Sequence, residues 1–216
     1  MIDDPEGFIR QNTALTPVPH APEISLYVAD EITPIWKMTE QALGAMGISP
    51  PFWAFAWAGG QALARYVLDH PETVAGKTVL DFAAGSGLVA IAAMKAGAAH
   101  TLACDIDPIC RAAIAVNAEA NGVNVEAVIA DLLGQPPPKV DVILAGDICY
   151  EKTLTGRVLN WLQTARAAGV RVLIGDPGRT YFPKSGLAPL AEYQVRTTRE
   201  LEDFEIKRTG VWTFPD

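Results

Sequence analysis

The sequence predicts a doubly wound α/β domain built on a mostly parallel sheet. Between residues 78 and 177, five short apolar runs recur, and most are separated by segments of helical character. Near-continuous apolar runs are typical of parallel strands that helices cover on both faces. Two segments near the C-terminus instead alternate polar and apolar residues, with too short a gap between them for a crossover helix. Together these observations predict a seven-stranded sheet that ends in an antiparallel hairpin.

The first half of the predicted sheet lies between residues 78 and 131. In order, its segments are a strand at 78–83, a glycine turn at 85–87, a helix at 88–97, a strand at 101–106, a helix at 108–121 and a strand at 125–131. The helix at 88–97 is apolar nearly all round until Lys95, so we expect it to be deeply buried.

The second half of the sheet follows a proline-rich loop. Its segments are the loop at 134–139, a strand at 140–147, a helix at 152–168, a strand at 170–177 and hairpin strands at 192–200 and 204–214. The gap between the hairpin strands suits an antiparallel turn at one end of the sheet.

Residues 1–50 are predicted to form a helical N-terminal extension that precedes the domain at 51–216. Residues 16–23 are extended and interrupted by prolines. Thr33 and Pro34 are typical of the start of a helix, and Gly47 is typical of its end. A further helix is expected at about 60–69, and we expect it to end there because Pro71 follows.

The composition indicates an acidic protein of ordinary globular character. Its net charge of −8 disfavours nucleic acid as a partner, because phosphate backbones require clustered Lys and Arg. The first fifty residues hold seven acidic and two basic side chains, which we read as a solvated surface, with recognition of a basic partner as the alternative. Three cysteines without a CxxC pair and three scattered histidines predict reduced thiols and no metal site.

The start of the chain lacks the basic and hydrophobic regions of a signal peptide. No apolar run reaches the ~18 residues that a membrane span needs. We therefore expect a cytoplasmic protein without a membrane partner, and we favour a monomer.

Charged and small residues follow the first two strands, where ligands of such sheets bind. Asp81 ends the first strand, ahead of Gly85 and Gly87, whose missing side chains let a ligand approach the backbone. Asp105 ends the second strand, about 20 residues past the turn, where an acid accepts hydrogen bonds from ribose hydroxyls.

Ile106 and Asp131 extend this set. Ile106 can lie on an adenine ring, and Asp131, at the end of the third strand, can accept a hydrogen bond from the adenine amino group. Any one of the aspartates can instead cap the following helix. Three of them at successive strand ends favour a nucleoside ligand. The glycine spacing differs from the GxGxxG that seats a pyrophosphate, which disfavours a dehydrogenase.

This combination of aspartates and glycine turn resembles the class I, seven-strand methyltransferases that use S-adenosylmethionine. The resemblance implies a Rossmann-like methyltransferase fold, whose last strands form the antiparallel hairpin. It implies donor-binding roles for Trp57, Asp81, Gly85, Gly87, Asp105, Ile106 and Asp131. One departure is Ala83, because the family usually has glycine at this position.

Residues 146–150, GDICY, fit the Asp-x-x-Tyr motif of the protein-methylating family 16 branch. With FWAFAWAGGQALARYVLDHP at 52–71, ACDIDPI at 103–109 and VLIGDPGR at 172–179, the chain is similar to the lysine methyltransferases of the electron transfer flavoprotein β subunit. The resemblance implies methyl transfer from S-adenosylmethionine to lysine side chains of that subunit, without a metal. Asp147 and Tyr150 would be the catalytic residues, which accept hydrogen bonds from the amine and orient it.

Aromatic residues and a further aspartate complete the predicted substrate site. Trp57 is expected to line the amine channel, since aromatic faces hold ammonium groups, and it stands where the family commonly has Trp-Pro-Gly-Gly. We read Phe52, Trp53 and Phe55 as core packing. Asp176 either contacts the substrate or fixes its loop through Arg179.

Two alternatives remain at this point. The first is a methyltransferase of another protein, such as a ribosomal protein. The second is a non-catalytic Rossmann-like module that binds a nucleoside.

Overall fold

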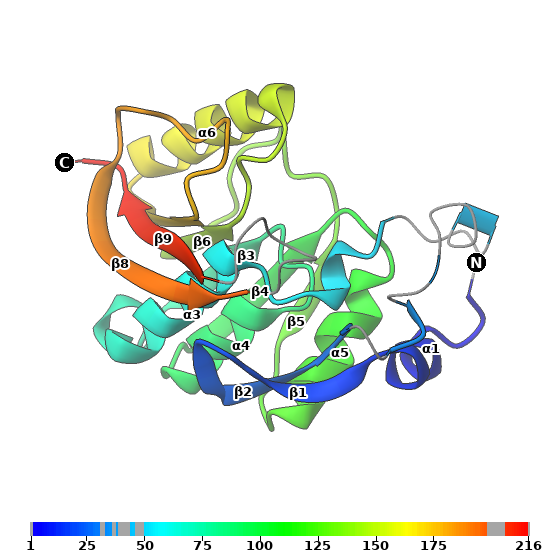
Figure 1. Ribbon diagram of the computed structural model, residues 1–216. Coiled ribbons are helices and arrows are strands. Elements are labelled where there is room, and N and C mark those ends of the chain that lie inside the picture. Colours follow the sequence, from blue (N-terminus) through cyan, green and yellow to red (C-terminus); the bar gives the residue numbers. More distant parts are fainter. Residues whose placement is uncertain are drawn as a thin grey trace.

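The computed structural model contains a seven-stranded sheet with helices on both faces (Figure 1). It describes residues 2–30, 33–35, 38, 44–45, 50–197 and 206–215. The strands are β3 (Thr78–Phe82), β4 (His100–Asp105), β5 (Glu126–Ile129), β6 (Val142–Gly146), β7 (Arg171–Asp176), β8 (Ala188–Arg196) and β9 (Ile206–Thr213). The predicted fold class, including the C-terminal antiparallel hairpin, is confirmed.

The order of the strands indicates where on the sheet a ligand would bind. The strands lie in the order β5-β4-β3-β6-β7-β9-β8, with β9 antiparallel to both of its neighbours. The chain moves outward from β3 through β4 to β5 and then returns to β6 on the other side of β3. The order therefore reverses between β3 and β6, and ligands of such sheets bind beyond the strand ends at this point.

Five helices and two single 3-10 turns belong to the described part of the chain. They are α1 (Pro5–Asn12), α3 (Ala58–Asp69), α4 (Leu88–Lys95), α5 (Cys110–Ala120), α6 (Lys152–Ala167), η2 (Phe52–Ala54) and η3 (Pro71–Thr73). The deep burial predicted for α4 is confirmed, since its residues from Leu88 to Ala93 are all buried. Within the described ranges, none of the helices has both the length and the apolar character to cross a membrane.

Alternate side chains of the central strands enter two separate cores. Val142 and Leu144 of β6 pack with residues of α3 and α4, whereas Ile143 and Ala145 pack with residues of α6. This period of two is the geometry of a strand buried on both faces. The sheet is therefore fixed from both sides, and its strand ends are held rigidly.

The N-terminal part of the chain packs across α4 and α5 (blue in Figure 1). After α1, strands β1 (Ala14–Val18) and β2 (Ala21–Val28) pair antiparallel. Ile24 and Leu26 of β2 are fully buried in a cluster with residues of α3 and α4. This hairpin lies where the sequence predicted only extended chain. The helix predicted from Thr33 to Gly47 lies mostly outside the described residues.

Candidate functional site

The turn after β3 has three backbone positions in the left-handed region. These are Ala83 (φ 58°), Gly85 (φ 50°) and Gly87 (φ 80°). Glycine adopts this conformation readily, whereas alanine is strained there. The Gly85 N–H donates to Oδ2 of Asp105 at 2.9 Å. The turn therefore ties the end of β3 to the end of β4, as a shared ligand site requires.

Asp81 lies beneath this turn and is 2% exposed. Its Oδ2 accepts a hydrogen bond from the Ala90 N–H in α4 at 2.9 Å. Burial raises the pKa of Asp81 to about 8, and the nearby Asp105 charge acts in the same direction. This carboxyl group therefore holds a proton near neutral pH and would lose it when a cation binds close by.

Asp105, Ile106 and Asp131 lie at the surface along the ends of β4 and β5. Ile106 is 72% exposed, which is unusual for a large aliphatic side chain. The Asp131 carboxylate accepts from the Leu133 N–H at 2.9 Å and lies 4.0 Å from Arg157. An exposed apolar surface with carboxylates on neighbouring strand ends suits a ligand that has a flat ring and hydroxyl or amino donors.

Asp147 follows β6, the strand that lies next to β3 across the switch point. Its backbone is left-handed (φ 56°), and its N–H donates to the Gly175 carbonyl at 2.9 Å. Oδ2 accepts from the Gly60 N–H, in the first turn of α3, at 2.9 Å. Oδ1 accepts from Arg179, with 2.6 Å to Nη2 and 3.2 Å to Nε. The carboxylate is therefore held from two sides.

Glycines allow α3 to begin directly on the ends of β6 and β7. A Cβ added to Gly59 would lie 2.2 Å from the Gly175 oxygen and 2.7 Å from Oδ2 of Asp147. A Cβ added to Gly146 would lie 3.0 Å from Cα of Gly60. Backbone meets backbone here, so the Gly59-Gly60 pair sets the position of the Asp147 carboxylate as well as the start of the helix.

A row of aromatic rings leads from Tyr150 to Arg179, the partner of Asp147. Tyr150 is 56% exposed and Phe52 is 55% exposed, with their ring centroids 6.1 Å apart. The Phe52 and Trp57 rings are also 6.1 Å apart, and the Arg179 guanidinium lies 5.6 Å from the Trp57 ring centroid. Core packing is confirmed for Trp53, which is 1% exposed, but it is wrong for Phe52. The single turn of η2 directs these two consecutive side chains to different sides.

Asp176, at the end of β7, is 1% exposed. Its Oδ1 accepts from the backbone N–H groups of Gly178 at 2.8 Å and Arg179 at 2.7 Å. Burial raises the pKa of Asp176 to about 6. These bonds fix the loop that carries Arg179, whereas a contact of Asp176 with substrate stays a prediction.

Cys149 lies between Asp147 and Tyr150 in the sequence and is fully buried. Burial raises the pKa of its thiol to about 12, so this cysteine is not a nucleophile near neutral pH. Within the described residues, no group of three His, Cys, Asp or Glu side chains is placed to hold a metal ion.

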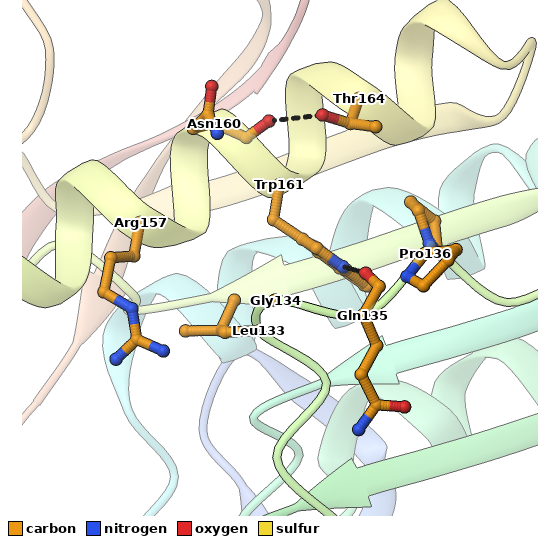
Figure 2. A pocket seen from close by; sticks show the side chains of 9 residues that line it. Leu133, Gly134, Gln135, Pro136, Arg157, Asn160, Trp161 and Thr164 are labelled. Carbon is orange, nitrogen blue, oxygen red and sulfur yellow. Dashed lines mark hydrogen bonds between the residues drawn. The ribbon is translucent and has the colours of Figure 1, made fainter.

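A surface groove runs between α6 and the loop after β5 (Figure 2). Its lining consists of Leu133, Gly134, Gln135, Pro136, Pro137, Arg157, Asn160, Trp161 and Thr164. Two side chains in its walls donate to carbonyl groups within the walls: the Trp161 indole to Gln135 at 3.0 Å and the Thr164 hydroxyl to Asn160 at 3.0 Å. None of these lining residues belongs to the predicted site, so we place the candidate site at the strand ends.

Comparison with known proteins identifies two kinds of methyltransferase. The family model of the ribosomal protein L11 methyltransferase (PrmA) matches residues 61–150. The electron transfer flavoprotein beta subunit lysine methyltransferase of Rattus norvegicus is 38% identical over 216 residues, which cover 97% of this chain and 84% of the relative. The protein of the same name from Homo sapiens is 38% identical over 220 residues, which cover 98% of this chain and 83% of the relative.

Solved structures share the fold at lower identity. The ribosomal protein L11 methylase of Lactobacillus delbrueckii subsp. bulgaricus has a TM-score of 0.52 at 20% identity, covering 75% of this chain and 81% of that one. The magnesium protoporphyrin IX methyltransferase of Synechocystis PCC 6803 with bound SAM has a TM-score of 0.53 at 19% identity, covering 72% and 79%. These structures establish the fold alone, whereas the rat and human relatives match nearly the whole chain. The chain belongs to the family of electron transfer flavoprotein β subunit lysine methyltransferases.

Proposed function

We propose that this enzyme transfers methyl groups from S-adenosylmethionine to lysine side chains of the electron transfer flavoprotein β subunit. The observation that carries the proposal is the Asp147 carboxylate, held at the end of β6 by the Gly60 N–H and by Arg179, whose guanidinium lies over the Trp57 ring. The rat and human relatives carry this acceptor in their names, and their match over nearly the whole chain supports the same acceptor here.

The methyl donor is proposed to bind at the turn after β3 and along the ends of β4 and β5. The carboxylates and the exposed Ile106 suit its amino group, ribose hydroxyls and adenine ring. The residues proposed to hold it are Trp57, Asp81, Gly85, Gly87, Asp105, Ile106 and Asp131. When bound, the donor supplies a methyl group activated on a positively charged sulfur, which an unprotonated lysine amine can accept by in-line displacement.

The protein must therefore favour the neutral form of the substrate lysine amine and orient it toward the methyl group. A lysine amine has a pKa of ~10.4 in water and is protonated at neutral pH. We propose that a lysine side chain bound against the rings of Phe52, Trp57 and Tyr150 loses its water, and loss of water favours the neutral form of an amine. The released proton passes to solvent.

Asp147 and Tyr150 are proposed to accept hydrogen bonds from this neutral amine and to orient its lone pair. Burial raises the pKa of Tyr150, so its hydroxyl stays protonated and accepts through oxygen. Alignment of the amine supplies the rate enhancement, and no strong base is needed. Asp176 is proposed to act at the rim of the same site, through the loop that it fixes.

Labelling of the purified acceptor tests the proposed substrate. Enzyme, isotopically labelled S-adenosylmethionine and purified flavoprotein β subunit are incubated, and labelled peptides are identified by mass spectrometry. We expect the label on lysine side chains of that subunit. Label on another protein, with none on the flavoprotein subunit, would refute the acceptor and leave the chemistry intact.

A ribosomal protein is the second candidate acceptor, because the ribosomal protein L11 methyltransferase model matches residues 61–150. The same assay with purified ribosomal protein L11 distinguishes the two. Donor binding without label on either protein, or on any protein of a cell extract, would instead indicate a non-catalytic nucleoside-binding module.

We also propose that the enzyme is a cytoplasmic monomer that acts on protein and not on nucleic acid, with residues 1–50 as an extension of the domain at 51–216. The net charge of −8 supports the exclusion of nucleic acid, and the three free cysteines support a cytoplasmic location. Light scattering of the purified protein tests the monomer. Stable binding of RNA at low salt would contradict the exclusion of nucleic acid.

A further inference from the structure

The Asp147 carboxylate is already paired with a cation inside the site. Two nitrogens of Arg179 reach its Oδ1, at 2.6 Å and 3.2 Å. The two side chains are 12% and 19% exposed, so water screens this pair only weakly. The guanidinium also lies over the Trp57 ring, 5.6 Å from its centroid. A carboxylate and a guanidinium in this contact form a unit without net charge.

An isolated carboxylate next to the acceptor amine would oppose the reaction. An opposite charge within ~4–6 Å favours the charged form of a titratable group and shifts its pKa by about 1–3 units. Beside an unpaired Asp147, the substrate lysine would therefore remain an ammonium ion, which has no lone pair. A carboxylate that is paired with a cation still accepts a hydrogen bond, but it attracts the ammonium far less.

We propose that Arg179 is a positioning residue that cancels the charge of the Asp147 carboxylate, so that this carboxylate orients the substrate amine without stabilising its ammonium form. The inference rests on the proposed function, in which Asp147 contacts a lysine amine. It gives a role to a residue outside the Asp-x-x-Tyr motif, and this role acts through Asp147.

The fold fixes both members of the pair. The Gly60 N–H binds the second oxygen of Asp147 at 2.9 Å, which sets the plane of the carboxylate. Asp176 accepts from the backbone N–H of Arg179 at 2.7 Å, and Gly178 takes the left-handed conformation (φ 78°) that turns the loop back. The backbone of Arg179 is therefore fixed in a position from which its side chain reaches Asp147.

Asp176 and Cys149 are titratable groups that interact with the pair. Burial raises the pKa of Asp176 to about 6 and that of Cys149 to about 12. Burial raises the pKa of Tyr150, and the charges of Asp105 and Glu151 act in the same direction. The start of α3 contributes the Gly60 N–H to this contact. Between the pKa values of Asp176 and Cys149 neither group changes its charge, so a change of rate with pH in this range reports on the substrate amine.

The pH dependence of methylation tests this role with three variants. Arg179→Gln removes the charge, and Arg179→Lys keeps the charge but loses the two-nitrogen contact. Arg208→Gln is the control, because it removes a cation from an exposed pair with Glu192 in the C-terminal hairpin. For each, kcat and KM for the flavoprotein β subunit are measured at saturating donor from about pH 7 to about pH 10, together with donor binding.

For Arg179→Gln we expect the midpoint of the pH–rate profile to rise by about one unit or more. Activity near neutral pH should fall about 10-fold or more and recover in alkaline solution, because one pH unit is a factor of ten in the neutral amine. KM should fall together with kcat, since an unpaired carboxylate binds the ammonium ion more tightly. Arg179→Lys and Arg208→Gln should keep the wild-type midpoint.

A loss of activity by the same factor at every pH, with an unmoved midpoint, would overturn the inference and leave Arg179 a purely structural role. If Arg179→Gln does not fold, Arg179→Lys decides, because a midpoint that moves away from that of Arg208→Gln would contradict charge cancellation. These outcomes are read on an active wild-type enzyme. A wild-type enzyme that binds donor and methylates no protein would overturn the proposed function, and this role with it.

Discussion

Replacement of Gly59 by alanine should dislodge the helix that holds the Asp147 carboxylate. Gly59 lies in the first turn of α3, where the helix meets the ends of β6 and β7. Its added Cβ would lie 2.2 Å from the Gly175 oxygen, against 3.4 Å for ordinary contact, so one backbone would have to move by 3.4 − 2.2 = 1.2 Å. Both neighbours of this Cβ are fixed, because Gly175 pairs within the sheet and Asp147 is bound by Arg179.

The cost has two parts. Overpacking of a tightly packed region costs about 1–3 kcal/mol, and loss of the bond from the Gly60 N–H to a charged carboxylate costs about 1.5–3 kcal/mol. Alanine in place of glycine within a helix returns about 0.5–1 kcal/mol. We expect the free energy of unfolding to fall by about 2–5 kcal/mol, and methylation to be lost in the molecules that remain folded.

Two other glycines provide matched controls. A Cβ on Gly60 would lie 3.7 Å from Leu88 and 3.9 Å from Val89, and a Cβ on Gly156 of α6 would meet nothing within 4 Å. Gly60→Ala and Gly156→Ala should therefore leave stability unchanged or raise it by up to about 1 kcal/mol. Urea denaturation of the three variants makes the comparison. A Gly59→Ala protein as stable and active as Gly60→Ala would refute the close backbone contact.

Three further predictions follow from single residues. The pKa of Asp81 is raised from 3.8 to about 8 by burial, so the stability that its neutral form contributes is present below the lower value and is lost as pH rises through the higher one. Asp81→Asn should flatten this decline in a series of thermal unfolding curves without donor, and an unchanged slope would contradict it. Ala83→Gly relieves a left-handed alanine and should stabilise the protein by up to about 1 kcal/mol in urea, whereas a clear loss of stability would count against strain at this position. Phe52→Ala should raise KM for the protein substrate about 2- to 5-fold, with an unchanged melting temperature because the ring is 55% exposed. An unchanged KM would remove Phe52 from the channel.

The sheet could be predicted from the sequence because its signals are local. Each central strand is an apolar run with its own turn residues, and the order of these runs already implies parallel strands. The two C-terminal segments show the alternation of a hairpin, and β8 and β9 pair as expected.

The N-terminal hairpin could not be predicted in the same way. Prolines interrupt the alternation of β1 and β2, which masks their strand character. Part of the backbone of β2 is bound by distant side chains in and just after α5, since the N–H of Tyr27 donates to Asn117 at 2.7 Å and that of Ser25 to Asn121 at 3.1 Å. Partners that are 90 and 96 residues away leave no local pattern in the sequence.

In the candidate site too, local features could be predicted from the sequence and long-range contacts could not. The strand-end carboxylates could be predicted, because a strand end is visible in the sequence. The contacts of Asp147 with Gly60 and with the Arg179 side chain, 87 and 32 residues away, could not. The sequence suggested Arg179 only as a partner of Asp176, and that link turns out to use the Arg179 backbone while its guanidinium goes to Asp147.

The turnover of Asp147→Asn, measured beside donor binding, tests most directly whether Asp147 holds the acceptor amine. Asparagine accepts the left-handed backbone and keeps an oxygen for the Gly60 N–H, but it loses the charge that pairs with Arg179, so turnover is compared per folded molecule. Asp141→Asn is the control, because Asp141 binds the Thr78 N–H at the opposite end of the β6 region. We predict that kcat falls about 100-fold or more for Asp147→Asn, with donor affinity unchanged, and that Asp141→Asn behaves as wild type. Wild-type turnover by Asp147→Asn, or loss of donor binding with it, would contradict this role.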